Sequence, residues 1–269
     1  MIKTSDSAGD LLRAWRHRRR LSQLSLATEA EISQRHLSFI ESGRAMPSRD
    51  MVLHLSEYLT IPLRERNTIL LAAGFAPVYR ERPLDDPGFT AARHAVDMIL
   101  EGHAPHPALA VNRQWVMVSS NRSVAPLLAG IDKSQLAPPL NVLRLSLHPD
   151  GLAPRIANFR EWRTHILQRL ERQIHASADA GLIALLEELK GFPIPPSAKP
   201  WQPTKTATFG GLAIPLELIV DVGVLRFIST TTIFGTAVDI TLAELTIESF
   251  FPADTFTAEV MRQQDSGRP

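Results

Sequence analysis

The sequence predicts two folded regions of different class, an all-α region over residues 1–75 and an α+β region over residues 89–260 with one antiparallel sheet. In the first region, apolar residues recur at helical spacing in five short runs. From residue 211 the chain is instead rich in β-branched and aromatic residues, which favour strands. Residues 76–88 contain three prolines and mixed charge and are predicted to be a linker.

Length and composition narrow the class of protein. The chain has 269 residues, 44% of them hydrophobic, which is enough for one large domain or two ordinary ones. It contains no cysteine, so disulfides, thiol catalysis and cysteine-based zinc sites are excluded. No run of 18 apolar residues occurs, and the N-terminus lacks the apolar core of a signal peptide. We therefore expect a cytoplasmic protein that makes no membrane contact.

The first predicted helix covers residues 9–20, with Leu11, Leu12 and Trp15 on one face. The rest of its surface is crowded with arginines, namely Arg13, Arg16, Arg18, Arg19 and Arg20. Such a helix is either simply solvated or places some of its guanidinium groups on a phosphate backbone.

Two short helices follow within residues 21–44, whose sequence is LSQLSLATEAEISQRHLSFIESGR. The first has an apolar face of Leu24, Leu26 and Ala27, and serines stand where helix N-caps would stand, at Ser22 and Ser33. Runs this short need packing partners, so the two helices are expected to pack on each other. Two short helices joined by a tight turn form a helix-turn-helix, whose second helix enters the major groove of DNA.

The polar residues left outside the packed face suit this role. Arginine can pair bidentately with guanine and glutamine with adenine, which makes Arg35 and Gln34 candidates for reading base edges. Gln23 begins the first short helix, where its amide could meet a phosphate. The residues that we expect to contact DNA are Gln23, Ser33, Gln34, Arg35, Ser38, Arg44 and Arg49.

The pattern SQLSLA, then ISQRHLSFIESGR, then Pro47-Ser48 resembles the lambda-repressor-like (XRE-type) helix-turn-helix family over roughly residues 9–75. The resemblance implies a five-helix DNA-binding domain, with further helices over residues 50–59 and 63–73. One position departs from it, because Glu31 stands where glycine is usual, and a positive φ there costs about 1 kcal/mol. The alternative is a plain helical hairpin with a chance polar face.

Charge is distributed as the DNA interpretation requires. Residues 1–75 hold 11 basic and 8 acidic residues, a net charge of +3, whereas the remainder holds 18 basic and 20 acidic residues, a net charge of −2. Phosphate neutralisation calls for such a surplus near the contact, although a difference this small only supports the interpretation.

The second region is predicted to begin with a helix over residues 89–102 and two short strands within residues 106–121. Residues 121–130 are predicted to form a short helix entered through Asn121. Longer helices follow over residues 156–176 and 182–189. Three strands joined by short hairpins are then expected within GLAIPLELIV, VLRFISTTTIF and AELTIESFF. Residues 261–269 are predicted to be a disordered tail.

Five strands with helices inserted after the second strand is the plan of a PAS-like sensor. The stretches ALAVNRQWVMVSSNRSVAPLL and NVLRLSLHPDGLAPRIANFREWRTHILQRL, with the strand-rich end, also resemble the ligand-binding domain of MmyB-like transcription regulators. This resemblance covers roughly residues 89–255. It implies a pocket between sheet and helices for a small apolar molecule, such as a fatty-acid-like ligand.

Candidate pocket residues lie on the longest predicted helix and around it. Phe159, Trp162 and Ile166 share one helical stripe, and Arg144 or Arg163 could meet a carboxylate head group. The residues that we expect to bind the ligand are Asn121, Arg144, Phe159, Trp162, Arg163 and Ile166. The alternative is that the stripe is plain core and the arginines are solvated.

No catalytic pattern stands out. HExxH, GxGxxG, P-loop and GxSxG motifs are all missing, and His103 and His106 lie in a proline-flanked loop without a carboxylate at useful spacing. We therefore predict no catalytic residue, no metal site and no cofactor other than the apolar ligand.

Together these features predict a sequence-specific DNA-binding regulator, acting as a homodimer on double-stranded DNA, whose second domain senses a small apolar molecule. Two alternatives stay open. One is a ligand-free dimeric repressor, and the other is an enzyme or carrier of apolar molecules with an attached DNA-binding head.

Overall fold

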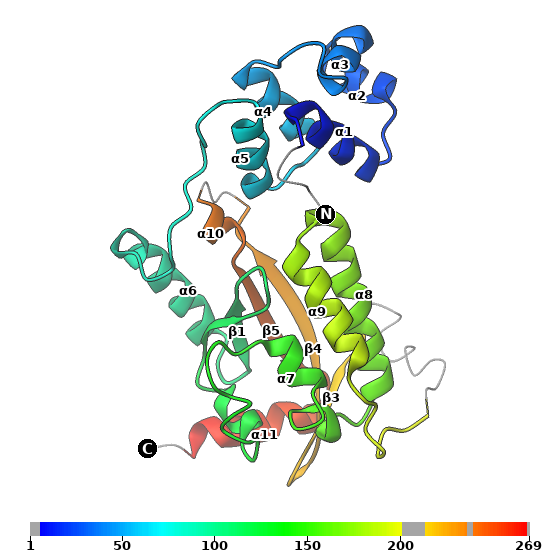
Figure 1. The fold of residues 1–269 in the computed structure, drawn as a ribbon. Helices are drawn as coiled ribbons and strands as arrows, with labels where there is room; N and C mark the ends of the chain where they lie inside the picture. Colours follow the sequence, from blue (N-terminus) through cyan, green and yellow to red (C-terminus); the bar gives the residue numbers. More distant parts are fainter. Residues whose placement is uncertain (1–5, 201–212, 236–238, 268–269) are drawn as a thin grey trace. The chain divides into compact units, whose positions relative to one another are not determined.

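The structure is a computed structural model that describes residues 6–200, 213–235 and 239–267 (Figure 1). The chain divides into two compact units. The N-terminal unit comprises residues 1–82 with two short segments, 175–178 and 236–243, and the C-terminal unit comprises the rest. No helix of the described residues is long and apolar enough to cross a lipid bilayer.

Five helices form the body of the N-terminal unit, as predicted. They are α1 (Ala8–Arg18), α2 (Gln23–Glu29), α3 (Gln34–Glu41), α4 (Arg49–Tyr58) and α5 (Leu63–Ala72). The Oγ atoms of Ser22, Ser33 and Ser48 accept hydrogen bonds from backbone N–H groups three residues later, at 3.0, 3.1 and 3.1 Å. Each serine satisfies one of the amide groups that the first turn of a helix leaves without a partner.

Helices α1 and α3 approach each other closely in the core of this unit. A Cβ atom at Gly9 would lie 2.1 Å from the carbonyl oxygen of Ile40, so only glycine fits at this crossing. Leu12, Leu26 and Leu37 fill the core beside it and are almost fully buried. The prediction that Leu24 belongs to the packed apolar face of α2 is wrong, because its side chain is 60% exposed. A two-turn helix has room for only a narrow buried stripe, and Leu26 and Ala27 occupy it.

The turn between α2 and α3 keeps the geometry that usually requires glycine. Glu31 has a φ of 53°, in the left-handed region. The next amide, that of Ile32, donates a 2.9 Å hydrogen bond to the carbonyl oxygen of Ala27. Packing of the two helices therefore holds a strained residue in place, rather than the turn changing its shape.

The C-terminal unit is built on one five-stranded sheet in which every neighbouring pair is antiparallel. The spatial order is β2-β1-β5-β4-β3. The strands are β1 (Ala108–Val111), β2 (Met117–Ser120), β3 (Leu216–Val220), β4 (Gly223–Ile233) and β5 (Thr246–Pro252). This confirms the predicted α+β class with a PAS-like order of elements. Residues 211–212 of the predicted third strand lie outside the described residues.

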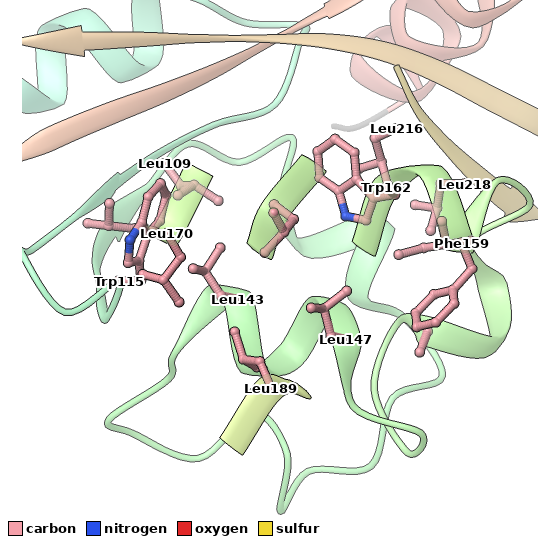
Figure 2. Close-up of a cluster of buried hydrophobic side chains, with 14 of the residues drawn as sticks. Leu109, Trp115, Leu143, Leu147, Phe159, Trp162, Leu170, Leu189, Leu216 and Leu218 are labelled. Carbon is pink, nitrogen blue, oxygen red and sulfur yellow. The ribbon is translucent and has the colours of Figure 1, made fainter. Parts of the chain in front are cut away.

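Helices cover the sheet on both faces. On one face, Val96 and Leu100 of α6 (Thr90–Gly102) pack with Ala108 and Ala110 of β1. The other face carries the larger core, shared with α7 (Val142–Leu147), α8 (Phe159–Ser177) and α9 (Ala180–Gly191). Figure 2 shows side chains of this core, among them Trp115, Leu143 and Trp162, converging beneath the strands.

Several local predictions for this unit are corrected. Residues 121–130 form only a short 3₁₀ helix, Ala125–Leu128, and Asn121 does not begin it. Helix α7 was not predicted. Strands β4 and β5 are not joined by a short hairpin, because α10 (Ile240–Ala243) lies between them in the chain.

The predicted C-terminal tail is also wrong. Residues up to Ser266 belong to α11 (Thr255–Ser266), whose Met261 is 1% exposed and lies in the larger core. The Oδ1 atom of Asp254 accepts a 2.7 Å hydrogen bond from the amide of Thr257 and so caps the helix. Residues 261–266 are polar apart from Met261, so their helical state depends on the cap and on one buried anchor.

We expect the Asp254→Ala variant to be less stable by about 1 kcal/mol, the usual cost of losing an N-cap. The substitution also removes the 3.1 Å ion pair between Asp254 and Arg226. Both side chains of this pair are partly exposed, so its loss should add little to the destabilisation. Asp254→Asn, which keeps the cap and loses the charge, is the matched control. Equal losses in chemical unfolding of the two variants would show that the charge, not the cap, stabilises α11.

Candidate functional site

The exposed face of α3 carries the residues predicted to read bases. Gln34 and Arg35 are exposed and Ser38 is half-buried, while Leu37 and Ile40 on the opposite side are buried in the core. The Arg35 guanidinium lies 5.3 Å from the centre of the Phe39 ring. Because this contact is with a ring face, the hydrogen-bond donors of Arg35 remain available at the surface.

The other residues predicted to contact DNA precede or follow α3 in the sequence. Ser33 caps α3, and Arg49 is the first residue of α4. Arg44 is exposed in the loop between these helices, where its amide donates a 2.9 Å hydrogen bond to the carbonyl oxygen of Phe39. The two arginines thus flank the C-terminal side of α3 with exposed positive charge.

Gln23 lies in a buried network that the sequence did not predict. Its Nε2 atom donates to Glu41 Oε2 at 2.8 Å, and Arg16 donates to the two oxygens of the same carboxylate from Nε at 2.6 Å and Nη2 at 2.7 Å. Glu41 is 2% exposed and Arg16 6%. This network, Arg16–Glu41–Gln23, joins α1, α2 and α3 and so fixes the angle between the two helices of the motif.

Burial acts to raise the pKa of Glu41, but the hydrogen bonds from Arg16 and Gln23 outweigh it and hold this pKa below its ordinary value. The expectation that Arg16 lies on the solvated side of α1 is wrong. Helical spacing could have predicted the burial of Arg16, because it follows Leu12 by four residues and so shares its buried face.

Arg19 also has a structural role. It donates from Nε to the carbonyl oxygen of Leu59 at 2.8 Å and from Nη2 to that of Thr60 at 3.0 Å. Carbonyl groups at the end of a helix have no partner within it, so Arg19 satisfies the end of α4. Arg16 in α1 and Arg19 at its C-cap therefore stabilise the fold.

The C-terminal unit contains a cavity of about 100 Å³ between the sheet and helices α7 and α8. Its wall is largely apolar and includes Leu109, Trp115, Leu143, Trp162, Ile166 and Phe250. Figure 2 shows where the labelled members of this group lie around the core. Concave apolar sites with a few polar groups are the usual form of small-molecule sites, which makes this cavity the candidate ligand site.

Of the six residues expected to bind the ligand, Trp162 and Ile166 line the cavity. Phe159 shares their stripe but lies in the core outside the lining. Asn121 is also outside the lining, and its side chain holds backbone groups together. It accepts from the amide of Ala108 at 3.1 Å and donates to the carbonyl oxygens of Leu100 and His106.

Both arginines predicted to meet a carboxylate head group are placed elsewhere. Arg144 donates to Glu188 from Nε at 2.5 Å and from Nη2 at 2.8 Å, and these hydrogen bonds to the carboxylate raise the pKa of Arg144. Arg163 donates from Nη2 to the carbonyl oxygen of Lys190 at 2.8 Å. Each guanidinium therefore already serves α9, and neither lines the cavity.

The charged groups at the cavity are instead Arg169 and Glu248, which the sequence did not single out. Arg169 Nη1 donates to Glu248 Oε2 at 3.0 Å, and Nη2 contacts Oε1. The guanidinium also lies 4.5 Å from the centre of the Trp115 ring. Helical spacing could have indicated Arg169, which follows Trp162 by seven residues and Ile166 by three and so extends their stripe.

Within the described residues, no three His, Cys, Asp or Glu side chains lie together so that they could hold a metal ion. What this unit offers a ligand is a largely apolar enclosure with one charged pair in its wall. What the N-terminal unit offers a partner is an exposed helix with a glutamine and an arginine.

Comparison with known proteins agrees with this division. Residues 7–69 match the description "Helix-turn-helix domain", and residues 92–263 match "MmyB-like transcription regulator ligand binding domain". No curated protein matches the chain. Both matched descriptions are those of regulator domains, and the second covers more than half of the sequence. The chain belongs to the MmyB-like transcription regulators, DNA-binding proteins with an N-terminal helix-turn-helix and a C-terminal ligand-binding domain.

Proposed function

We propose that this regulator binds double-stranded DNA as a homodimer and responds to a small apolar molecule, of alkyl-chain character like a fatty acid, held in the cavity of its C-terminal unit. The observation that carries the proposal is the composition of the cavity wall. Of its lining residues, the leucines, tryptophans and Phe250 give an apolar surface, and the charged lining residues, Arg169 and Glu248, are paired with each other. Such a wall favours an apolar body over a sugar or a nucleotide.

The dimer follows from the way such motifs read DNA. One recognition helix contacts only a few base pairs, so useful specificity needs two helices in successive major grooves, about 34 Å apart. The second copy is supplied most simply by the same chain, which would then read a two-fold symmetric site. We expect the C-terminal unit or residues 76–88 to hold the two copies together.

Regulation would act on the arrangement of the two DNA-reading heads. A ligand shifts an equilibrium only by the difference between its affinities for the two states. The cavity of about 100 Å³ is smaller than the 300–1,000 Å³ typical of drug-sized ligands, so a longer molecule must move side chains of the wall. Helices α7 and α8 supply that wall and are the elements that we expect to shift.

The direct test is to extract the purified full-length protein with organic solvent and to identify any stoichiometric species by mass spectrometry. The Leu143→Phe variant, which adds volume at the cavity wall, should lose that species. Leu71→Phe, at a side chain that is 59% exposed, is the matched control and should retain it. An apolar species held equally by all three proteins would place the ligand elsewhere.

An empty extract from the wild-type protein would be followed by titration with alkyl-chain probes. Failure of these probes to bind would overturn ligand sensing by the cavity. It would leave the DNA-binding role intact and favour a second domain that serves dimerisation alone.

A further inference from the structure

The charged part of the cavity wall, here called its polar end, is the ion pair of Arg169 and Glu248. Glu248 is 4% exposed, lies on β5 and faces the same side of the sheet as Leu109, its partner in register on β1. Arg169 reaches it from α8. In the described lining of the cavity these are the charged side chains, one of each sign, so the polar end carries no net charge.

We propose that the cavity selects ligands whose polar end is uncharged and can both donate and accept a hydrogen bond, as an alcohol does, over ligands that end in a carboxylate. This inference rests on the proposed function, namely that the cavity binds an apolar molecule. It specifies the head group: the molecule shares the alkyl chain of a fatty acid but ends in an uncharged group instead of the carboxylate.

The pair has hydrogen-bonding capacity left for such a head group. A guanidinium has five N–H groups, and those of Arg169 serve Glu248 and the Oγ1 atom of Thr231. Within the described residues, its Nε–H and one Nη1–H form no hydrogen bond. Glu248 Oε1 accepts from both Arg169 and Thr231, whereas in the part of the chain that the structure describes Oε2 accepts from Arg169 alone. A hydroxyl group could accept a hydrogen bond from Arg169 and donate one to Oε2 of Glu248.

A carboxylate head group would bind less favourably at this ion pair. It would lose its water and enter a site where the one cation is already shared with a buried anion. Taking a charge out of water is costly unless it gains its own partner, and here the added charge would be unpaired. Arg144 and Arg163 cannot supply that partner, because Glu188 and the carbonyl oxygen of Lys190 hold them outside the cavity.

Three remaining interactions hold the pair in this geometry. Thr231 Oγ1 donates to Glu248 Oε1 at 2.9 Å. Trp115 lies under the Arg169 guanidinium, and its Nε1 donates to Gln173 Oε1 at 2.8 Å. A ligand that separates Arg169 from Glu248 must break these contacts as well, so adding to the intact pair is favoured over displacing one member.

The test compares 1-octanol with octanoate, which share a chain length and differ in the head group. Binding to the wild-type full-length protein is measured by calorimetry at about pH 7.5, where a carboxylic acid is ionised. We expect octanoate to bind at least about tenfold more weakly than 1-octanol, because its charge is not compensated.

Glu248→Gln provides the charge test. It keeps the shape of the side chain and leaves Arg169 as an unshared cation, so octanoate should gain about tenfold or more relative to 1-octanol. Glu217→Gln, at a half-buried position of β3 outside the cavity lining, is the matched control and should bind both probes as the wild type does. Thermal unfolding confirms that each variant is folded, and the wild-type comparison decides the matter if Glu248→Gln is not.

The possible outcomes distinguish the head-group selection from ligand binding by the cavity. Octanoate binding to the wild-type protein as tightly as 1-octanol would overturn the head-group selection and leave apolar ligand binding in place. Octanoate binding unchanged in Glu248→Gln would also overturn it. Neither probe binding to the wild-type protein would overturn the proposed ligand site and the selection together.

Discussion

Replacing Arg16 by methionine should lower the free energy of unfolding of the N-terminal unit by about 3–5 kcal/mol, the cost of removing one partner from a buried ion pair. The variant leaves Glu41, 2% exposed, with only the Gln23 amide among the donors of the network. It also removes the 2.8 Å hydrogen bond from Arg16 Nη1 to the carbonyl oxygen of Leu21. Because methionine nearly matches the length of the arginine stem, the loss reports charge and hydrogen bonding rather than packing.

Arg13→Met is the matched control on the same helix. Arg13 pairs with Asp10 at 2.5 Å, but both side chains are about half exposed, so its loss should cost at most about 1 kcal/mol. Chemical unfolding followed by circular dichroism measures both variants. Similar losses in the two would mean that the Arg16–Glu41–Gln23 network is not the element that holds α1 to α3.

The network also gives stability a pH dependence of known sign. The pKa of Glu41 is lowered in the folded protein, so its contribution is fully present above the pKa of the unfolded chain, about 4.3. The contribution is lost as pH falls through the lower folded pKa. The difference in unfolding free energy between the wild type and Glu41→Gln should therefore be constant near neutral pH and shrink in acid. A constant difference down to the acid limit would contradict the assigned pKa shift.

Replacing Arg35 by alanine should relax base preference at one position of the DNA site and cost about 1–3 kcal/mol in binding, as expected for a bidentate base contact. Arg35 is exposed near the start of α3, and its guanidinium rests on Phe39 without a charged partner in the described residues. Its donors are therefore available to a guanine edge. Binding is compared across duplexes that differ at single positions.

Arg44→Ala is the control for this experiment, because its exposed loop position suits a phosphate. It should weaken binding to all sequences alike and reduce the slope of log affinity against log salt by about 1. A changed base preference in Arg44→Ala, or an unchanged one in Arg35→Ala, would show that the two roles are assigned wrongly.

Much of the fold follows from local signals in the sequence. Serine caps and helical spacing predict α1 to α5 to within a few residues, since an N-cap acts on amides only three positions away. Enrichment in β-branched and aromatic residues likewise predicts strands β3 to β5. The turn at Glu31 was predicted with its strain, because the resemblance placed a left-handed residue there.

Features that depend on distant partners were not predictable in this way. Arg144 pairs with Glu188 and Arg169 with Glu248, which lie 44 and 79 residues away in the chain, so the sequence around each arginine does not show its partner. Helix α11 was missed for a related reason, because the burial of Met261 depends on a core that distant segments supply. Contacts between segments far apart in the chain decide these cases, and a single sequence does not show them.

Selection from random duplex DNA by the full-length protein tests the central claim most directly. The predicted result is an enriched two-fold symmetric sequence whose half-sites are about 10 base pairs apart, with affinity that changes when an alkyl-chain ligand is added. Recovery of no common sequence would contradict DNA reading by α3. A symmetric site whose affinity is the same with the cavity filled and empty would contradict ligand control.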